Sequence, residues 1–178
     1  MILWRREQPV EWHSEDLVLR EWAADDVESM VALFDTEEMN RWTPLASPFD
    51  RDVALQYVAQ AHRLRHDNGT LQLAVTEDGG TPLGEVLIFP ADDADTVELA
   101  FAIGAPFQGR GLARRAVAAV LDIARAAGTT TARLTIATGN VRSQRVATAA
   151  GFLRTPAPLE TRRRKGFVLT MATWERQL

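Results

Sequence analysis

Apolar residues recur at helical spacing in several segments of the chain. In the three longest, apolar side chains return at intervals of three or four residues, which places them on one face of a helix: residues 27–34, 53–64 and 112–127. Asn68-Gly69 follows the second segment and Gly128 follows the third, as expected at helix ends. We predict helices over these segments and a shorter one over residues 141–150, which Gly151 ends.

Other segments combine apolar and β-branched residues over strand-like lengths. These predict strands over residues 17–22, 71–76, 82–89, 97–103, 133–138 and 167–174. Asp78-Gly79-Gly80 is a hairpin turn signal, so residues 70–103 are predicted to form an antiparallel meander. A helix lies between the last two strands of the 97–138 region, an order that favours a right-handed crossover and a parallel strand pair.

The length of 178 residues fits one domain, which we place at residues 14–178 after an N-terminal arm of residues 1–13. The sequence has no cysteine, which excludes disulfides, thiolate metal sites and a cysteine nucleophile. His62 and His66 stand one helical turn apart without a third ligand, so we expect no metal. The net charge of -4 argues against a nucleic-acid partner.

No apolar stretch reaches the roughly 20 residues that would span a bilayer. Glu7-Gln8-Pro9 follows Arg5 and Arg6, where a signal peptide would continue with apolar residues. We therefore expect a cytoplasmic protein with no membrane partner.

The candidate chemistry begins where the strand ending at Ile103 gives way to the helix starting near Leu112. Between them lie Gly109 and Gly111, whose missing Cβ atoms let a ligand approach the backbone. The first amides of a helix are unpaired and lie at the positive end of its dipole, so this turn could bind a pyrophosphate. The alternative is that the glycines only form a tight turn. A P-loop would need Gly-Lys-Ser/Thr, which does not occur, and a Rossmann motif would need glycine where Arg114 stands.

Three motifs in order resemble a known family. Gln108-x-x-Gly111-x-Ala113 resembles the Arg/Gln-x-x-Gly-x-Gly/Ala motif of the GNAT N-acetyltransferase superfamily. A second pattern, at residues 140–152, runs Asn140-x-x-Ser143-x-x-x-Ala147-x-x-x-Gly151-Phe152. It is similar to the branch of ribosomal-protein N-terminal (Rim-type) acetyltransferases, as is the strand Glu98-Leu99-Ala100-Phe101, which resembles Glu-Ile-Gly-Tyr. The order of elements agrees over about residues 14–177.

The resemblance implies a fold and a donor. The fold would be of the mixed α/β (α+β) class, with a mostly antiparallel sheet of six to seven strands, helices on both faces and a splayed parallel strand pair. Acetyl-CoA would be the co-substrate, with no metal, and its pantetheine arm would lie between the strands ending at Ile103 and Thr138. The residues that would hold acetyl-CoA are Phe101, Ala102 and Ile103 along the arm, Gln108, Gly109, Arg110, Gly111, Leu112 and Ala113 at the pyrophosphate, and Asn140, Ser143 and Arg145.

Direct attack of an amine on the thioester needs a base and produces a thiolate that an acid can protonate. Glu98 is the candidate base because strand alternation would place it with Ala100 and Ala102, away from Leu99; the alternative is a solvated glutamate. The usual GNAT acid is a tyrosine, but the single tyrosine, Tyr57, lies in an early helix. Ser143 is therefore the candidate acid, although its position in the first turn after Asn140 equally fits a purely structural role.

The acceptor is the least determined part. In the family it resembles, the loop containing Trp42 helps to form the acceptor entrance, so Trp42 and Glu98 are the candidate substrate-binding residues; Trp42 could equally cap the core. The basic run Arg162–Lys165 could meet the CoA phosphates or an acidic acceptor, but it fits a charged turn better. The expected acceptor is a primary amine of a protein N-terminus, a lysine or a small molecule. A larger donor such as succinyl-CoA, a non-catalytic acyl-CoA sensor and a homodimer stay open.

Overall fold

The computed structural model describes residues 9–14 and 16–178. These residues form a nine-stranded sheet in the order β1-β2-β3-β4-β5-β6-β9-β7, with β8 paired to β9 outside this path. Among the described strands, β5 and β6 pair in parallel and all other neighbours pair antiparallel. The strands are β1 (Glu11–Ser14), β2 (Leu17–Glu21), β3 (Leu71–Thr76), β4 (Gly84–Pro90), β5 (Thr96–Ile103), β6 (Thr131–Ala137), β7 (Leu153–Arg154), β8 (Glu160–Arg164) and β9 (Phe167–Gln177).

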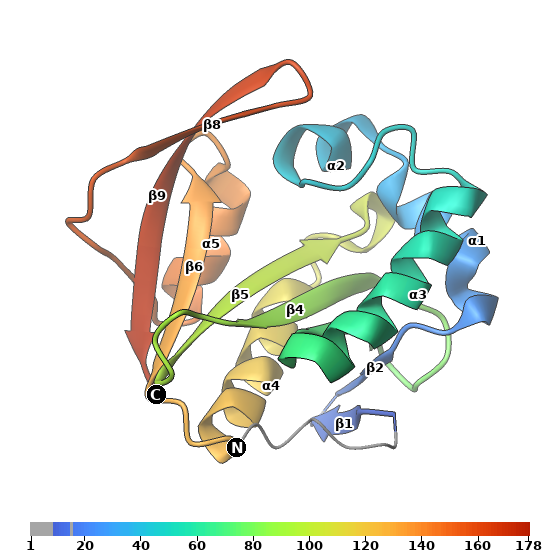
Figure 1. Cartoon of the computed structure of the whole chain (residues 1–178), viewed down its shortest axis with the longest axis horizontal. Coiled ribbons are helices and arrows are strands. Elements are labelled where there is room, and N and C mark those ends of the chain that lie inside the picture. Colours follow the sequence, from blue (N-terminus) through green and yellow to red (C-terminus); the bar gives the residue numbers. More distant parts are fainter. Residues whose placement is uncertain (1–8, 15) are drawn as a thin grey trace.

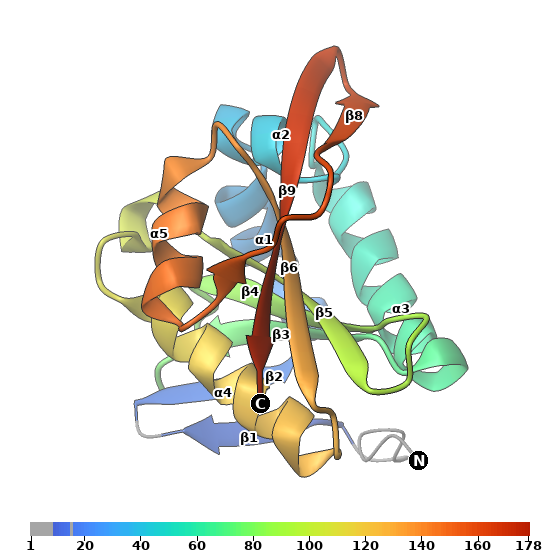
Figure 2. The same cartoon turned by 90° about the vertical axis from the view of Figure 1, so that its left-hand side faces the viewer.

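Helices cover both faces of the sheet (Figures 1 and 2). The first group, on one face, comprises the 3-10 turn η1 (Ala24–Asp26), α1 (Val27–Phe34), α2 (Glu37–Trp42) and α3 (Arg51–Asn68). On the other face lie α4 (Leu112–Ala126) and α5 (Val141–Ala149), and a 3-10 turn, η2 (Ala105–Phe107), precedes α4. No helix in the described ranges is both long and apolar enough to cross a membrane.

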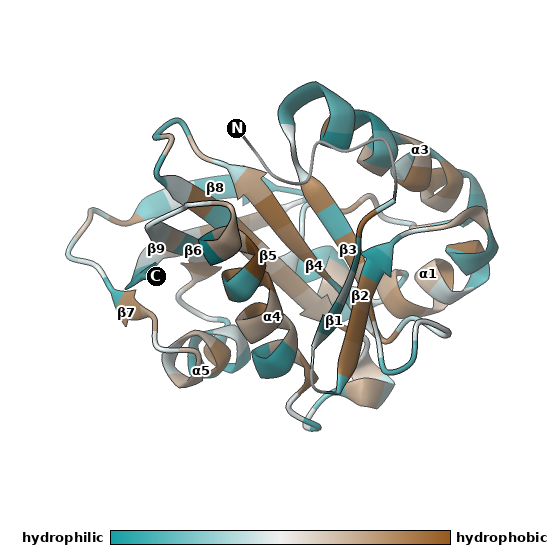
Figure 3. Cartoon of the chain, turned by 90° about the horizontal axis from the view of Figure 1, so that it is seen from below, coloured by the Kyte–Doolittle hydropathy of each residue, from teal (hydrophilic) through white to brown (hydrophobic). Residues whose placement is uncertain are grey.

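Each face of the sheet has its own apolar core. The larger core lies on the side of α4, where Leu112 and Val120 pack with Leu99 and Ile103 of β5. The second lies under α1 and α3 and includes Ala102 of the same strand. Figure 3 shows that the central strands are largely apolar while the helices carry hydrophilic stretches. Burying one large aliphatic side chain in such a core contributes about 1.5–3 kcal/mol.

The parallel strands β5 and β6 separate towards their carboxyl ends (Figure 1). Their pairing stops at Leu99 and Leu134. Beyond this point β5 continues to Ile103 alongside β4, and β6 continues to Ala137 alongside β9. Each strand thus keeps one neighbour while the gap between them opens, and this confirms the splayed pair.

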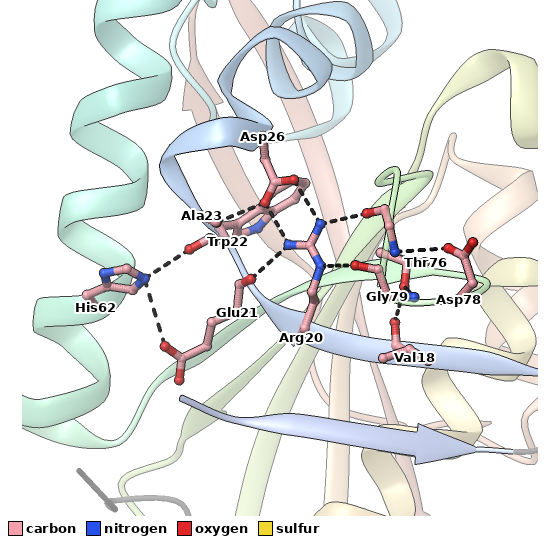
Figure 4. Close-up of polar contacts among 11 residues, drawn as sticks. Val18, Arg20, Glu21, Trp22, Ala23, Asp26, His62, Thr76, Asp78 and Gly79 are labelled. Atoms are coloured by element: carbon pink, nitrogen blue, oxygen red, sulfur yellow. Dashed lines mark hydrogen bonds and ion pairs between the residues drawn. The ribbon is translucent and has the colours of Figure 1, made fainter. Parts of the chain in front are cut away.

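A half-buried arginine ties the start of the α1–α3 layer to the sheet (Figure 4). The Arg20 guanidinium donates to both carboxylate oxygens of Asp26 at 2.7 and 2.8 Å, and to the carbonyl oxygens of Gly79 and Gly80 at 2.6 Å each. The hydrogen bonds with Asp26 raise the pKa of Arg20 above its ordinary value. The contact fixes the β3–β4 turn against η1, and it lies away from the gap between β5 and β6.

The fold agrees with most of the predicted elements and adds several short ones. The meander, the crossover helix and the parallel pair are confirmed. The sheet of the described residues has nine strands rather than six or seven, because β1, β7 and β8 are short additions. Residues 1–8 of the expected arm lie outside the described residues, and Glu11–Ser14 pair with β2.

Two local expectations are corrected. Trp42 was expected in a loop, but it is the last residue of the helix α2, which Thr36 caps by accepting a hydrogen bond from the Met39 amide at 3.2 Å. The basic run is not simply a charged turn, because its first three residues belong to β8. Lys165 and Gly166 make the turn, with φ values of 48° and 79°.

Candidate active site

The turn before α4 leaves backbone amides open to an anion. Gly109 and Gly111 have φ values of 78° and 73°, in the region that favours glycine. A Cβ atom at either position would meet nothing within 4 Å, so the space beside the backbone is open. Gly111 is the N-cap of α4, and no side chain in the described residues caps this helix end. The first amides of α4 can therefore bind a negatively charged group.

The side chain of Gln108, the first residue of this turn, forms hydrogen bonds with other residues of the chain. Its side-chain amide donates to the Ile103 carbonyl oxygen at 3.1 Å and to Glu38 Oε2 at 3.2 Å. Its Oε1 accepts a hydrogen bond from Arg142 at 2.8 Å. The next residues of the predicted pyrophosphate site, Gly109 and Arg110, are exposed, and Arg110 also forms an ion pair with Glu77.

The open end of the gap between β5 and β6 lies beside this turn. Residues 100–103 of β5 and 135–137 of β6 lie beyond the last parallel pair. The predicted arm-binding residues Phe101, Ala102 and Ile103 are therefore all in the separated part of β5.

Glu98 lies just before the gap, on the face of the sheet that carries α1–α3. Ala102 of the same strand packs into the core of that face, whereas Leu99 packs into the opposite core, so the expected alternation is confirmed. Thr135 Oγ1 of β6 donates to Glu98 Oε1 at 2.9 Å. Both side chains are half-buried and line an open groove of about 550 Å³.

The other charges in this groove are arranged as pairs. Arg133 donates two hydrogen bonds to Glu175 Oε1, at 2.8 and 3.0 Å. Arg162 Nη2 lies 3.0 Å from Glu160 Oε2. Glu98 differs, because its partner among the described residues is a neutral hydroxyl. Among the described residues Glu98 forms no ion pair, although Arg133 lies opposite it in the parallel register. Its carboxylate therefore suits the approach of an amine.

On the other side of the gap, α5 begins where β6 ends. Asn140 Oδ1 accepts a hydrogen bond from the Ser143 amide at 3.2 Å, so the predicted capping of α5 is confirmed. Ser143 is half-buried, and Arg145 and Arg114 are exposed. The contact between Arg142 and Gln108 places the first turn of α5 next to the turn before α4.

Trp42 ends α2 beside the same opening. Its ring packs with Ala137 at the end of β6 and with Leu169 and Met171 of β9. The Arg41 guanidinium lies 4.7 Å from the centre of the ring. Trp42 thus packs against the second half of the sheet and also stands at the end of the β5–β6 gap.

Two hydrogen bonds from side chains to backbone carbonyls hold the β8–β9 hairpin to this region. Arg164 Nη2 donates to the Trp42 carbonyl oxygen at 2.7 Å, and Lys165 Nζ donates to the Leu45 carbonyl oxygen at 2.8 Å. Burial lowers the pKa of both Arg164 and Lys165. Two cations of the basic run therefore hold the hairpin to the loop after α2 and do not face the turn before α4.

The tyrosine lies elsewhere, as the sequence indicated. Tyr57 Oη donates to Glu85 Oε2 at 2.7 Å inside the α1–α3 core. Burial, and then the Glu85 charge, raise the pKa of Tyr57 well above its ordinary value. Burial also raises the pKa of Glu85 to about 7, although the hydrogen bond from Tyr57 opposes this shift.

Sequence reasoning missed Thr135, Glu38 and Arg142. Strand alternation could have found Thr135, since it faces the same side of the sheet as Glu98. The other two residues give no local signal, because their contacts join α2, the turn before α4 and α5 across the fold. No group of three or more His, Asp or Glu side chains in the described part of the chain could hold a metal ion.

Comparisons with known proteins agree with this geometry. Residues 16–153 match the family model described as an acetyltransferase (GNAT) domain. No curated protein matches the chain in sequence.

Solved structures share the fold at low sequence identity. The ribosomal-protein-S5-alanine acetyltransferase from Vibrio fischeri is 18% identical, with a TM-score of 0.79 over 94% of this chain and 96% of that chain. Mycobacterium smegmatis RimJ in complex with CoA-disulfide is 17% identical, with a TM-score of 0.79 over 95% and 86%. The microcin C7 self-immunity acetyltransferase MccE, in complex with acetyl-CoA and AMP, is 16% identical, with a TM-score of 0.80 over 93% and 94%.

The family model covers most of the chain, and the structure contains both the splayed strands and the open turn that its motifs imply. The chain therefore belongs to the GNAT acetyltransferase family and is an acyl-CoA-dependent transferase.

Proposed function

We propose that the protein transfers the acetyl group of acetyl-CoA to a primary amine, and that the amine is the α-amino group of a polypeptide. The observation that carries the proposal is the position of Glu98, which faces an open groove directly beside the β5–β6 gap. An α-amine suits such a site because its ordinary pKa is near 8, well below that of lysine, so more of it is neutral near pH 7. The ribosomal-protein acetyltransferases among the similar structures support this choice of acceptor.

The donor would bind from the side of α4 and α5. The amides of Gly109 to Ala113 would hold the pyrophosphate at the N-terminus of α4. The pantetheine arm would lie along Phe101, Ala102 and Ile103, with Asn140 and Arg145 on the α5 side of the gap. This placement would bring the thioester towards Ala100, which shares the α1–α3 face of the sheet with Glu98.

In the reaction, the amine nitrogen attacks the thioester carbonyl carbon. The C–N bond forms, the C–S bond breaks, and CoA leaves as a thiolate. Glu98 accepts the proton that the amine loses, directly or through water, while the hydrogen bond from Thr135 orients the carboxylate. Ser143 donates a proton to the CoA sulfur and regains one from solvent.

Two substitutions test these roles. Glu98→Gln keeps the size and the hydrogen bond from Thr135 but removes the base, so kcat/KM should fall by about 10²-fold or more, while the Kd for acetyl-CoA stays within about twofold. Ser143→Ala should lower kcat with little change in helix stability, because Asn140 caps α5 through the Ser143 backbone amide.

Steady-state kinetics across pH and calorimetric titration with acetyl-CoA supply these values. Near-normal kcat/KM for Glu98→Gln at every pH would contradict the assignment of the base. Unchanged turnover for Ser143→Ala would show that the serine has a structural role and does not donate the proton to the CoA sulfur.

One observation favours a second candidate, a non-catalytic acyl-CoA sensor. The only tyrosine is committed to Glu85 and cannot serve the CoA sulfur. A sensor would bind acetyl-CoA and release no CoA with any amine, whereas the transferase releases CoA as an acceptor is acetylated.

A further inference from the structure

Three side chains meet across the open end of the β5–β6 gap. Arg142 Nη1 of α5 donates to Glu38 Oε1 of α2 at 2.9 Å and to Gln108 Oε1 at 2.8 Å. Gln108 Nε2 in turn donates to Glu38 Oε2 at 3.2 Å. We refer to these three residues as the Glu38–Gln108–Arg142 bridge.

The bridge joins elements from the two faces of the sheet. Glu38 belongs to α2, on the side of the acceptor groove, and Arg142 belongs to the first turn of α5, on the other side. Gln108 begins the turn whose amides would hold the pyrophosphate. It also donates to the Ile103 carbonyl oxygen, so the bridge is attached to the end of β5 itself.

The bridge contributes little to the stability of the fold. The Arg142 side chain is 73% exposed and that of Glu38 is 33% exposed. Ion pairs in such exposed positions contribute about 0–1 kcal/mol, because solvent screens the charges. The location of the bridge indicates a role in binding, because a pyrophosphate on the turn would place further negative charge beside the Arg142 guanidinium.

At its far end α2 carries Trp42. This ring packs with Ala137 and Met171, and its carbonyl oxygen receives the Arg164 hydrogen bond from the β8–β9 hairpin. The two ends of this short helix therefore contact different parts of the site. Glu38 contacts the turn before α4, and Trp42 contacts the β8–β9 hairpin. Because both residues belong to α2, a change in the mobility of Glu38 would also change the mobility of Trp42.

We propose that the Glu38–Gln108–Arg142 bridge couples donor binding to the acceptor site, with Glu38 as a positioning residue. CoA phosphates at the turn hold Arg142 and Gln108 in place, these hold Glu38, and α2 then keeps Trp42 at the end of the β5–β6 gap. Glu38 itself touches neither substrate. The proposal rests on the proposed function for its acceptor side only.

The test compares Glu38→Gln, Arg142→Met and the double variant with the wild-type chain. Glu37→Gln is the matched control, because it removes one carboxylate from the same helix at an exposed position. Hydrogen exchange of residues 37–42 is measured with and without CoA, the Kd for acetyl-CoA by calorimetry, and the KM of an acceptor peptide by steady-state kinetics.

CoA should slow exchange in α2 of the wild type and of Glu37→Gln, but not of Glu38→Gln. The acceptor KM should rise about 5- to 10-fold in Glu38→Gln, at the low end of measured couplings between sites, while the Kd for acetyl-CoA changes less than about threefold. Adding Glu38→Gln to Arg142→Met should raise the acceptor KM no further, as expected for residues that act as a unit.

Equal slowing of α2 exchange by CoA in Glu38→Gln and the wild type would overturn the proposal, and so would an unchanged acceptor KM. If no amine is acetylated even by the wild type, the proposed function fails. The exchange of α2 on CoA binding still decides the bridge in that case, because it requires no turnover.

Discussion

Two glutamates on neighbouring strands show how strongly position decides the chemistry of one residue type. Glu85 of β4 pairs with Ala102, and Glu98 of β5 pairs with Phe89, so both belong to the same face of the sheet. Glu85 is 4% exposed and bonded to Tyr57 in the core, whereas Glu98 is half-buried and faces the groove. We propose the second as the catalytic base because it lines the open groove.

The buried glutamate should leave a signature in stability. Its pKa is raised from 4.5 to about 7 in the folded chain, so the folded state keeps a proton that the unfolded chain has released between these values. The stabilisation is therefore fully present below about pH 4.5 and lost as pH rises through 7. Relative to Glu85→Gln, the wild type should lose up to about 3 kcal/mol of unfolding free energy over this interval.

Urea denaturation of both chains between about pH 5 and pH 8 measures this difference in slope. Glu37→Gln, at an exposed position, should follow the wild-type profile. Parallel profiles for the wild type and Glu85→Gln would show that Glu85 is ionised throughout.

At the scale of elements, α4 begins and ends with glycines of the same conformation but different surroundings. Gly111, at its N-terminus, has a φ of 73°, and Gly128, after its C-terminus, has a φ of 85°. A Cβ atom at either position would meet nothing within 4 Å. The two positions share the backbone strain of a substitution, and we expect only Gly111 to face a ligand.

Alanine at each position separates strain from binding. Gly111→Ala and Gly128→Ala should each destabilise the chain by about 1 kcal/mol, since left-handed backbone disfavours a side chain. Gly111→Ala alone should also weaken acetyl-CoA binding, by about tenfold, because its methyl group enters the space of the phosphates. Thermal denaturation and calorimetric titration provide the two readouts. Equal effects of both substitutions on acetyl-CoA binding would place the pyrophosphate elsewhere.

At the scale of the whole molecule, the sheet separates two approaches to one gap. The open turn lies at the start of α4 on one face, and the groove with Glu98 lies on the other. The β8–β9 hairpin is tied to the end of α2 and the loop after it through Arg164 and Lys165, and its strand β8 borders the second approach. A donor and an acceptor can therefore meet between β5 and β6 without sharing an opening.

Much of this architecture could be predicted from the sequence because it depends on local patterns of residues. Alternation in β5 placed Glu98 on the correct face, and Gly111 and Asn140 marked the starts of α4 and α5. The six-residue helix α2 was missed because it is too short for a period to show.

Other features depend on contacts distant in the chain. The sequence predicts a charged turn for the arginines of β8, because the strand becomes evident only from its pairing with β9. The contact of Glu38 with Arg142 joins residues 104 positions apart, and no local pattern encodes it.

Transfer itself is tested most directly with a lysine-free peptide, offered once with a free α-amine and once with that amine acetylated. CoA thiol release and peptide mass are followed together after acetyl-CoA and the wild-type chain are added. We expect one thiol for each free amine acetylated, and none with the blocked peptide. Binding of acetyl-CoA without thiol release for every free-amine peptide tried, or thiol release without an acetylated amine, would contradict it.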